Sequence, residues 1–150
     1  MKKIGTINQP ISSVIAGLGH TDTLVVADAG LPIPRETLRI DLALTAGIPT
    51  FCDTLRVVLE EMCVEQAIVA DEMLEMSPNV YLAVRKLLGD VPIKTVPHAT
   101  FKEQIRTSRA VIRTGECTPY ANVILVAGAW GFGAKASHCT YGWCAGGRRW

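Results

Sequence analysis

The sequence predicts a single domain of the α/β class, with three layers (α/β/α) and a mainly parallel central sheet. Its 150 residues are enough for one domain, and 49% of them are hydrophobic, which is enough to form a sizeable core. Segments with helical periodicity alternate with short, wholly apolar segments along the chain. This alternation is typical of a sheet whose two faces are both covered by helices.

A helix and a buried strand are the first predicted elements. Proline suits the first position of a helix, so we expect the helix to begin at Gln9-Pro10 and to end near Gly17. Its apolar residues recur at helical spacing, at Ile11, Val14, Ile15 and Leu18. The continuous apolar run at residues 24–27 predicts a strand, and residues 31–34 (Leu-Pro-Ile-Pro) must form a loop.

Two further helices and two further strands are expected in the middle of the chain. A second helix fits residues 53–62, with one apolar face made of Leu55, Val58, Leu59 and Met62. Residues 67–70 are a second apolar run and predict a buried strand. A third helix begins at Ser77-Pro78 and ends at Gly89, and a strand follows at residues 93–96.

The last elements are a fourth helix and two more strands. Thr100 and Glu103 have the spacing of a capping box at the start of a helix, and residues 111–113 and 123–127 are apolar runs that predict strands. Ligands of such sheets bind beyond the carboxyl ends of the strands. Three polar residues lie just after predicted strands: Asp28, His98 and Glu116.

Charge, hydropathy and cysteine content exclude several classes of protein. A net charge of +1 gives no electrostatic basis for binding nucleic acid. The longest apolar runs, such as residues 123–127, are too short to cross a membrane, and no segment has the layout of a signal peptide. The five cysteines include no C-x-x-C pair, which is typical of reduced thiols in a cytoplasmic protein. We therefore expect a cytoplasmic protein that binds neither nucleic acid nor a membrane.

Residues 130–150 differ in composition from the rest of the chain. They hold all three tryptophans, five of the 13 glycines and three basic residues, with no acidic residue and no periodic pattern. We therefore divide the chain into a domain at residues 1–129 and a Gly/Trp-rich C-terminal extension at residues 130–150. His138, Cys139 and Cys144 lie in this extension, but three possible ligands without a second half-site do not make a zinc motif. We expect no metal site.

A small set of polar residues remains as candidates for chemistry. The chain has no phosphate-binding loop, no dinucleotide-binding fingerprint and no nucleophile elbow, so the corresponding enzyme classes have no support. The remaining candidates lie near glycine or proline and are His20, Asp28, His98, Tyr120 and Asn122. Imidazole can donate and accept a proton near neutral pH. However, His20 also suits the end of a helix and His98 a solvated position, and the other three residues suit ordinary turns. The pattern alone leaves both interpretations open.

Several short sequence blocks resemble one family of sugar-converting enzymes. These blocks are Met1-Lys-Lys-Ile-Gly-Thr-Ile-Asn8, Leu18-Gly-His-Thr-Asp22, Asp28-Ala-Gly-Leu-Pro-Ile-Pro34, Arg39-Ile-Asp41 and Thr114-Gly-Glu-Cys-Thr-Pro-Tyr-Ala-Asn-Val-Ile-Leu125. In order and spacing, they are similar to those of the D-ribose pyranase family, which is related to the fucose mutarotases. The resemblance covers residues 1–129, and the sequence at residues 28–34 and 119–122 resembles that of the pyranase branch.

The resemblance implies an activity, a site and an assembly. The activity is the interconversion of β-D-ribopyranose and β-D-ribofuranose by acid/base-assisted opening and reclosure of the ring, without metal or organic cofactor. His20 matches the proton-donating histidine of the family. The positions that match its sugar-contacting residues are Asp28, His98, Tyr120, Ala121 and Asn122. The family further implies a cytoplasmic, ring-shaped homo-oligomer, commonly a decamer, with its sites at subunit boundaries.

Two other functions remain as alternatives. One is a fucose-type mutarotase, which exchanges the α and β anomers of a sugar without changing the size of its ring. The other is a non-catalytic sugar-binding or assembly module that retains the fold. The residue types themselves suit a ligand rich in hydroxyl groups, because carboxylate, phenol and amide groups can all hydrogen-bond to hydroxyls.

Overall fold

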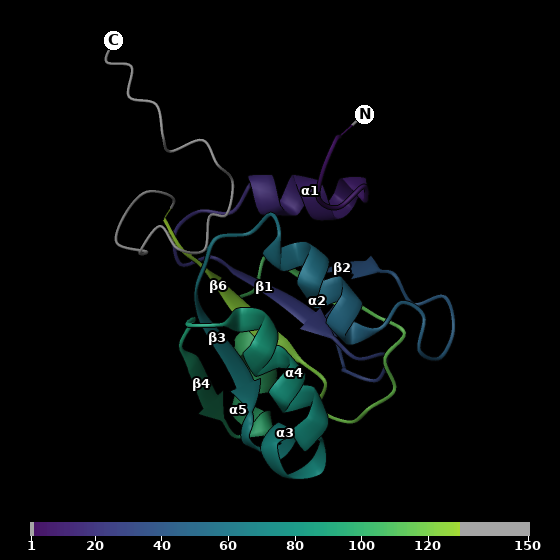
Figure 1. Cartoon of the computed structure of the whole chain (residues 1–150), viewed down its shortest axis with the longest axis vertical. Coiled ribbons are helices and arrows are strands. Elements are labelled where there is room, and N and C mark those ends of the chain that lie inside the picture. The colour runs from purple at the N-terminus through teal and green to yellow at the C-terminus, as the bar shows by residue number, and fades with distance from the viewer. Residues whose placement is uncertain (1, 130–150) are drawn as a thin grey trace.

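A six-stranded sheet forms the centre of the computed structural model, which describes residues 2–129 (Figure 1). In spatial order its strands are β2 (Leu38–Asp41), β5 (Ala110–Arg113), β1 (Thr23–Ala27), β6 (Val123–Ala127), β3 (Val64–Ala70) and β4 (Ile93–Val96). Strand β5 pairs in parallel with β1 and β2, and β3 pairs in parallel with β4. Most of the strand pairs are therefore parallel, as the sequence predicts.

Strand β6 lies in the middle of the sheet and runs antiparallel to both of its neighbours, β1 and β3. Its first residues therefore meet the last residues of β1, with Val123 opposite Val26. This direction has a consequence for the site. Because β6 is antiparallel to β1, the residues just before β6 lie beside the residues just after β1, at the end of the sheet where β1 ends.

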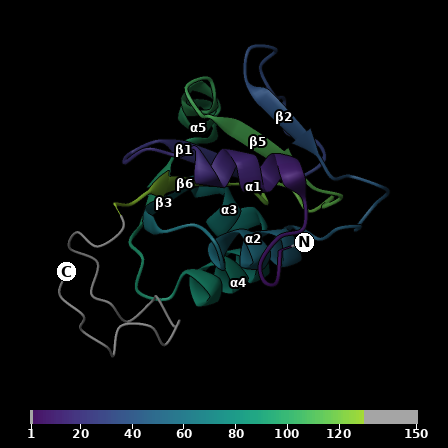
Figure 2. The same ribbon diagram turned by 90° about the horizontal axis from the view of Figure 1, so that it is seen from above.

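Helices cover both faces of this sheet, which confirms the predicted three-layer architecture. Helix α5 (His98–Ile105) lies on one face, whereas α2 (Phe51–Leu59) and α4 (Pro78–Leu88) lie on the other (Figure 2). Helices α1 (Gln9–Ala16) and α3 (Asp71–Met76) contribute Ile11 and Met73 to the core on the side of α2 and α4. The two outer layers are therefore unequal within the described part of the chain.

The core is divided into two apolar clusters by the sheet. Side chains of β1 alternate between them, with Leu24 and Val26 in the larger cluster and Val25 in the smaller one beneath α5. Phe101 anchors α5 in the smaller cluster and is fully buried. Truncation of such a phenylalanine costs about 3–5 kcal/mol of stability, so α5 is firmly attached to the sheet.

The predicted helices and strands are present, with shifted boundaries. Asn8 caps α1, where its Oδ1 accepts the N–H of Ile11 at 3.0 Å. Thr50 caps α2 in the same way, so this helix begins at Phe51 rather than at residue 53, and it ends at Leu59 rather than at residue 62. Strand β3 begins at Val64, three residues before the apolar run at 67–70. The sequence did not show this start because none of the first three residues is fully buried.

The structure contains two elements that the sequence did not predict. Strand β2 is an edge strand, and only one of its four residues is buried, so it shows no apolar run. Helix α3 has six residues and buries only Met73, which is too short a pattern to show helical periodicity. Both elements are held in place by tertiary contacts rather than by local sequence preference.

The predicted capping box at the start of the fourth helix is wrong. Helix α5 begins at His98, two residues before Thr100, and Pro97 occupies the capping position. Proline has no side-chain acceptor, and the carboxylate of Glu72 accepts the N–H of His98 instead. A distant residue therefore replaces the local cap.

Some expectations concern residues outside the described range of 2–129. The proposed extension at residues 130–150 lies outside the described residues, as do His138, Cys139 and Cys144. Among residues 2–129, no cluster of histidine, cysteine and acidic side chains could hold a metal ion. In the same range, no helix is both long and apolar enough to cross a membrane.

Candidate functional site

A cavity of about 500 Å³ opens at the edge of the sheet where β1 ends and β6 begins. This volume lies in the range of small-molecule sites. Asp28, His98, Tyr120 and Asn122 line the cavity together with Glu116. The structure thus brings four of the six predicted site residues together, at the carboxyl ends of parallel strands where a ligand crevice is expected.

Asp28 and Asn122 form a buried, reciprocal pair at the floor of this cavity. The amide Nδ2 of Asn122 donates to Oδ2 of Asp28 at 2.8 Å, and the backbone N–H of Asp28 donates to Oδ1 of Asn122 at 2.9 Å. The N–H of Gly30 donates to the other carboxylate oxygen, Oδ1 of Asp28, at 2.9 Å. Asn122 is 1% exposed and Asp28 is 8% exposed. Each carboxylate oxygen therefore has one fixed donor and retains lone-pair capacity for a ligand hydroxyl.

The segment that follows Asp28 is held from two sides. The N–H of Ala29 donates to the carbonyl oxygen of Glu116 at 2.8 Å. The carbonyl oxygen of Ala29 accepts from Nε of Arg113 at 3.0 Å, and the same guanidinium forms an ion pair with Asp41 at 3.0 Å. The backbone next to the candidate carboxylate is thus fixed before any ligand binds.

His98 and Tyr120 form one wall of the cavity through an edge-to-face ring contact. Their ring centroids are 5.0 Å apart, with an interplanar angle of 89°. The opposite contact of the imidazole is a stack on Phe101, at 6.1 Å and 16°. Nδ1 of His98 is buried and has no hydrogen-bond partner among residues 2–129.

The surroundings of His98 favour its neutral form. Burial lowers the pKa of His98, and the positive charge of Lys102 lowers it further, against the opposing effects of Glu72 and Asp28. A neutral imidazole carries one N–H donor and one nitrogen acceptor. At neutral pH, His98 is therefore suited to hydrogen-bond a hydroxyl group rather than to attract an anion.

The turn at Tyr120 has an unusual backbone conformation. Tyr120 has a φ of 62°, in the left-handed region, which costs a non-glycine residue of order 1–3 kcal/mol. The N–H of Asn122 donates to the carbonyl oxygen of Tyr120 at 2.7 Å, and the hydroxyl of Ser77 donates to the carbonyl oxygen of Pro119 at 2.6 Å. These bonds hold the phenol against the cavity. Ala121 is fully buried in the core and does not line the cavity.

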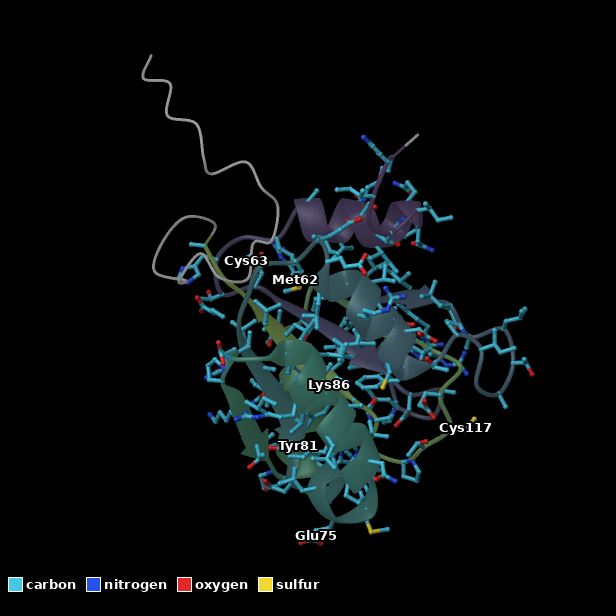
Figure 3. The ribbon with its side chains drawn as sticks, in the orientation of Figure 1. Met62, Cys63, Glu75, Tyr81, Lys86 and Cys117 are labelled. Carbon is cyan, nitrogen blue, oxygen red and sulfur yellow. The ribbon has the colours of Figure 1, made fainter. Side chains whose placement is uncertain are left out.

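Glu116 organises the loop between β5 and β6. Its Oε1 accepts from the N–H groups of Cys117 and Thr118, at 3.1 and 3.0 Å, and from the hydroxyl of Thr118 at 2.7 Å. Burial raises the pKa of this carboxyl, but the hydrogen bonds from Thr118, Phe51 and Cys117 outweigh burial and lower it overall. Glu116 is therefore a poor proton acceptor and a strong structural anchor. Figure 3 shows Cys117 on this loop, away from the helices that cover the sheet.

His20 lies at the opposite end of the sheet from the cavity. It occupies the turn before β1, where the N–H of the adjacent Thr21 donates to the carbonyl oxygen of Ala127 at 2.9 Å. The five residues of β1 separate this turn from Asp28, a span of about 16 Å at 3.3 Å per residue. The side chain is 57% exposed, and its Nε2 is 2.9 Å from Oε2 of Glu65. Within one chain, the structure does not bring His20 together with the cavity.

The cavity suits a small, neutral ligand with several hydroxyl groups. It offers a carboxylate that is already oriented, a neutral imidazole, a phenol and a buried amide. Fixed polar groups of this kind discriminate strongly between ligands, because a ligand that lacks the matching hydroxyl leaves them unpaired. Glu116 and Glu72 were not among the predicted site residues. Glu116 had a sequence signal, its position after a predicted strand, whereas Glu72 had none.

Comparison with known proteins identifies relatives that cover nearly all of the described chain. Residues 1–130 match the model of the RbsD / FucU transport protein family. A D-ribose pyranase from Coprothermobacter proteolyticus is 56% identical over 128 residues, which cover 85% of this chain and 98% of that protein. A D-ribose pyranase from Pectobacterium atrosepticum is 54% identical over 136 residues, again covering 85% of this chain and 98% of the relative.

Solved structures show the same fold. Bacillus subtilis RbsD, complexed with D-ribose, is 46% identical and superimposes with a TM-score of 0.84 over 86% of this chain and 98% of that one. A fucose mutarotase from Streptococcus pneumoniae, in complex with L-fucose, has a TM-score of 0.75 at 22% identity, over 86% and 99% of the two chains. The second likeness shows the fold alone. From the family match and the high identities, we conclude that the chain belongs to the RbsD / FucU transport protein family.

Proposed function

We propose that the chain is a D-ribose pyranase, an isomerase that interconverts β-D-ribopyranose and β-D-ribofuranose. The observation that carries this proposal is the 56% identity to a D-ribose pyranase across 98% of that protein. The polar cavity supports it, since its groups suit a small ligand with several hydroxyls. The likeness to a fucose mutarotase, at 22% identity, is much weaker than the likeness to RbsD in complex with ribose, at 46%.

The reaction exchanges one ring bond for another in two steps, and each step requires two proton transfers. The ring oxygen of the pyranose takes up a proton while the anomeric hydroxyl loses one, so the bond between C1 and the ring oxygen breaks and an open-chain aldehyde forms. The 4-hydroxyl then adds to C1 and loses its proton, while the aldehyde oxygen takes up a proton and the furanose ring closes. No group is oxidised or reduced. A positioned acid/base group contributes about 10²–10⁴-fold to such proton transfers.

We assign the sugar-binding roles to the residues that line the cavity or lie next to it. The carboxylate of Asp28 accepts hydrogen bonds from ring hydroxyls, and the neutral imidazole of His98 and the phenol of Tyr120 bind further hydroxyls. Ala121 and Asn122 contribute by holding the tyrosine turn and orienting the carboxylate. The bonds within the Asp28–Asn122 pair support this division of roles, because they fix the carboxylate before the sugar arrives.

We assign the role of proton donor to His20 of a neighbouring copy of the chain. The separation of His20 from the cavity of its own chain, by the full length of β1, supports this assignment. So does its 57% exposed side chain, whose ring is oriented by Glu65 and is accessible to a second copy. The assembly we propose is a ring-shaped homo-oligomer, a decamer, in which one copy supplies the cavity and the next supplies His20.

We further propose that the protein works in the cytoplasm. Cys52, Cys63 and Cys117 are free thiols in the described part of the chain, and Cys117 is exposed. Thiols that stay unpaired are typical of a reducing compartment. Mass spectrometry of the protein from freshly lysed cells, after alkylation without a reductant, would find these three cysteines alkylated.

Saturation-transfer NMR tests the proposed reaction directly. The pyranose and furanose forms of ribose give separate anomeric signals, so catalysed exchange transfers saturation from one form to the other. We expect the protein to accelerate exchange between ribopyranose and ribofuranose. Exchange confined to the α and β anomers of L-fucose would identify a fucose-type mutarotase instead, and no exchange with either sugar would leave a binding or assembly module.

A further inference from the structure

Helix α3 contacts the backbone behind both sides of the cavity, although it lines no part of it. It directly follows β3 and leads into α4, so its two ends face different parts of the site. Glu72, in its first turn, reaches the start of α5. Ser77, at the junction with α4, reaches the turn that carries Tyr120.

The contact of Glu72 is made to the backbone of His98. Oε2 of Glu72 accepts the N–H of His98 at 2.9 Å, and Oε1 accepts it at 3.2 Å. His98 is the first residue of α5, and the preceding Pro97 has no side chain that could cap the helix. Both oxygens of one carboxylate therefore fix the residue whose ring lines the cavity.

Ser77 contacts the turn that carries Tyr120, on the side of the cavity opposite His98. Its hydroxyl donates to the carbonyl oxygen of Pro119 at 2.6 Å, and Ser77 itself is buried. The next residue is Tyr120, whose left-handed backbone conformation needs external support. The ring contact between His98 and Tyr120 joins the two sides.

We propose that α3 is the positioning element of the cavity, with Glu72 holding the His98 side and Ser77 holding the Tyr120 side. Neither residue touches the sugar; each acts through the residue that it holds. The proposal rests on the assignment of this cavity as the ribose site. The charge of Glu72 has a second effect, because it opposes the lowering of the His98 pKa by burial and by Lys102.

Two variants of Glu72 separate its hydrogen bond from its charge. Glu72→Gln keeps an oxygen that accepts the N–H of His98 but removes the charge, whereas Glu72→Ala removes both. Glu75→Gln is the matched control. Glu75 lies on the same helix, is exposed, and points away from the sheet (Figure 3).

The readouts are the hydrogen exchange of the His98 amide, the NMR titration of its imidazole, and ribose affinity by calorimetry. In Glu72→Gln we expect a protected amide, a lower His98 pKa and a ribose Kd within about twofold of the wild type. In Glu72→Ala we expect an unprotected amide and a Kd raised about five- to tenfold, the size of effect that loss of a helix cap produces. Ser77→Ala should raise the Kd and leave the His98 pKa unchanged. Glu75→Gln should change none of these values.

Two results would overturn the proposal. One is a folded Glu72→Ala protein with a protected His98 amide and the ribose affinity of the wild type, and the other is a folded Ser77→Ala protein with the ribose Kd of the wild type. If Glu72→Ala does not fold, the ribose Kd of Ser77→Ala decides. The exchange and titration readouts need no sugar. A wild-type protein that binds no ribose would thus refute the proposed function, while the test of α3 would still give an answer.

Discussion

Replacement of Asp28 by asparagine should weaken ribose binding strongly, and the structure gives the size of the effect. The carboxylate accepts one hydrogen bond on each oxygen, from Gly30 and from Asn122. An amide at position 28 has a single acceptor oxygen, so one of these donors loses its partner. A buried donor without a partner costs about 1–3 kcal/mol of stability.

The effect on binding comes from the lost charge. A hydrogen bond to a charged group contributes about 1.5–3 kcal/mol, which corresponds to about 10- to 150-fold in Kd. We therefore expect Asp28→Asn to raise the ribose Kd by at least about tenfold, measured by calorimetry, while denaturant unfolding shows a loss of about 1–3 kcal/mol. Asp90→Asn is the control, because Asp90 is exposed in the turn between α4 and β4.

A swapped pair separates the two effects. In the double variant Asp28→Asn with Asn122→Asp, the new carboxylate can accept from the backbone N–H of residue 28 and from the new amide, and the amide oxygen can accept from Gly30. All three hydrogen bonds of the wild-type pair have a counterpart, so stability should recover. The charge now lies at position 122, so ribose affinity should stay low. A ribose Kd equal to that of the wild type in Asp28→Asn would refute the direct contact.

The other predictions concern the proton donor, His98 and the C-terminal residues. His20→Ala should lower enzyme-accelerated ribose exchange by about 10²–10⁴-fold and leave circular dichroism and the oligomer unchanged; full activity would contradict the assigned role. Calorimetry across pH should show that ribose binding persists where an ordinary histidine is already charged, and that binding is lost only as the pH falls through the lowered pKa of His98. Loss of binding with a midpoint at the pKa of an ordinary histidine would contradict this prediction. A chain that stops after Ala129 should keep ring-exchange activity and form an oligomer that is at least as uniform, by light scattering, as that of the full chain. A truncated chain that folds but is inactive or monomeric would show that residues 130–150 are needed for activity or assembly.

Much of the fold could be predicted from the sequence because most of its elements are buried. Apolar runs such as residues 24–27 and 123–127 form strands at the centre of the sheet, where both faces are covered. The direction of β6 could not be predicted, since a wholly apolar run is the same in either direction. The edge strand β2 was missed because it faces solvent, and α3 was missed because its six residues bury one side chain.

The candidate site could likewise be predicted from the sequence only in part. Asp28 and His98 follow predicted strands, so their meeting at one edge of the sheet follows from the topology. The pairing of Asp28 with Asn122 depends on the antiparallel direction of β6 and needed the structure. The cap on α5 comes from Glu72, 26 residues before His98, and no local pattern encodes a contact at that distance.

The central claim is that one copy of the chain supplies the cavity and another supplies His20. Co-expression of His20→Ala chains with Asp28→Asn chains, followed by saturation-transfer NMR on ribose, tests it most directly. At a ribose concentration well below the wild-type Kd, Asp28→Asn chains should retain at most about a tenth of the exchange rate and His20→Ala chains about a hundredth or less. In mixed oligomers, about a quarter of the sites combine an intact cavity with an intact His20. We predict that the mixed protein regains about a quarter of the wild-type exchange rate. Mixed oligomers as inactive as either variant alone would contradict the shared site.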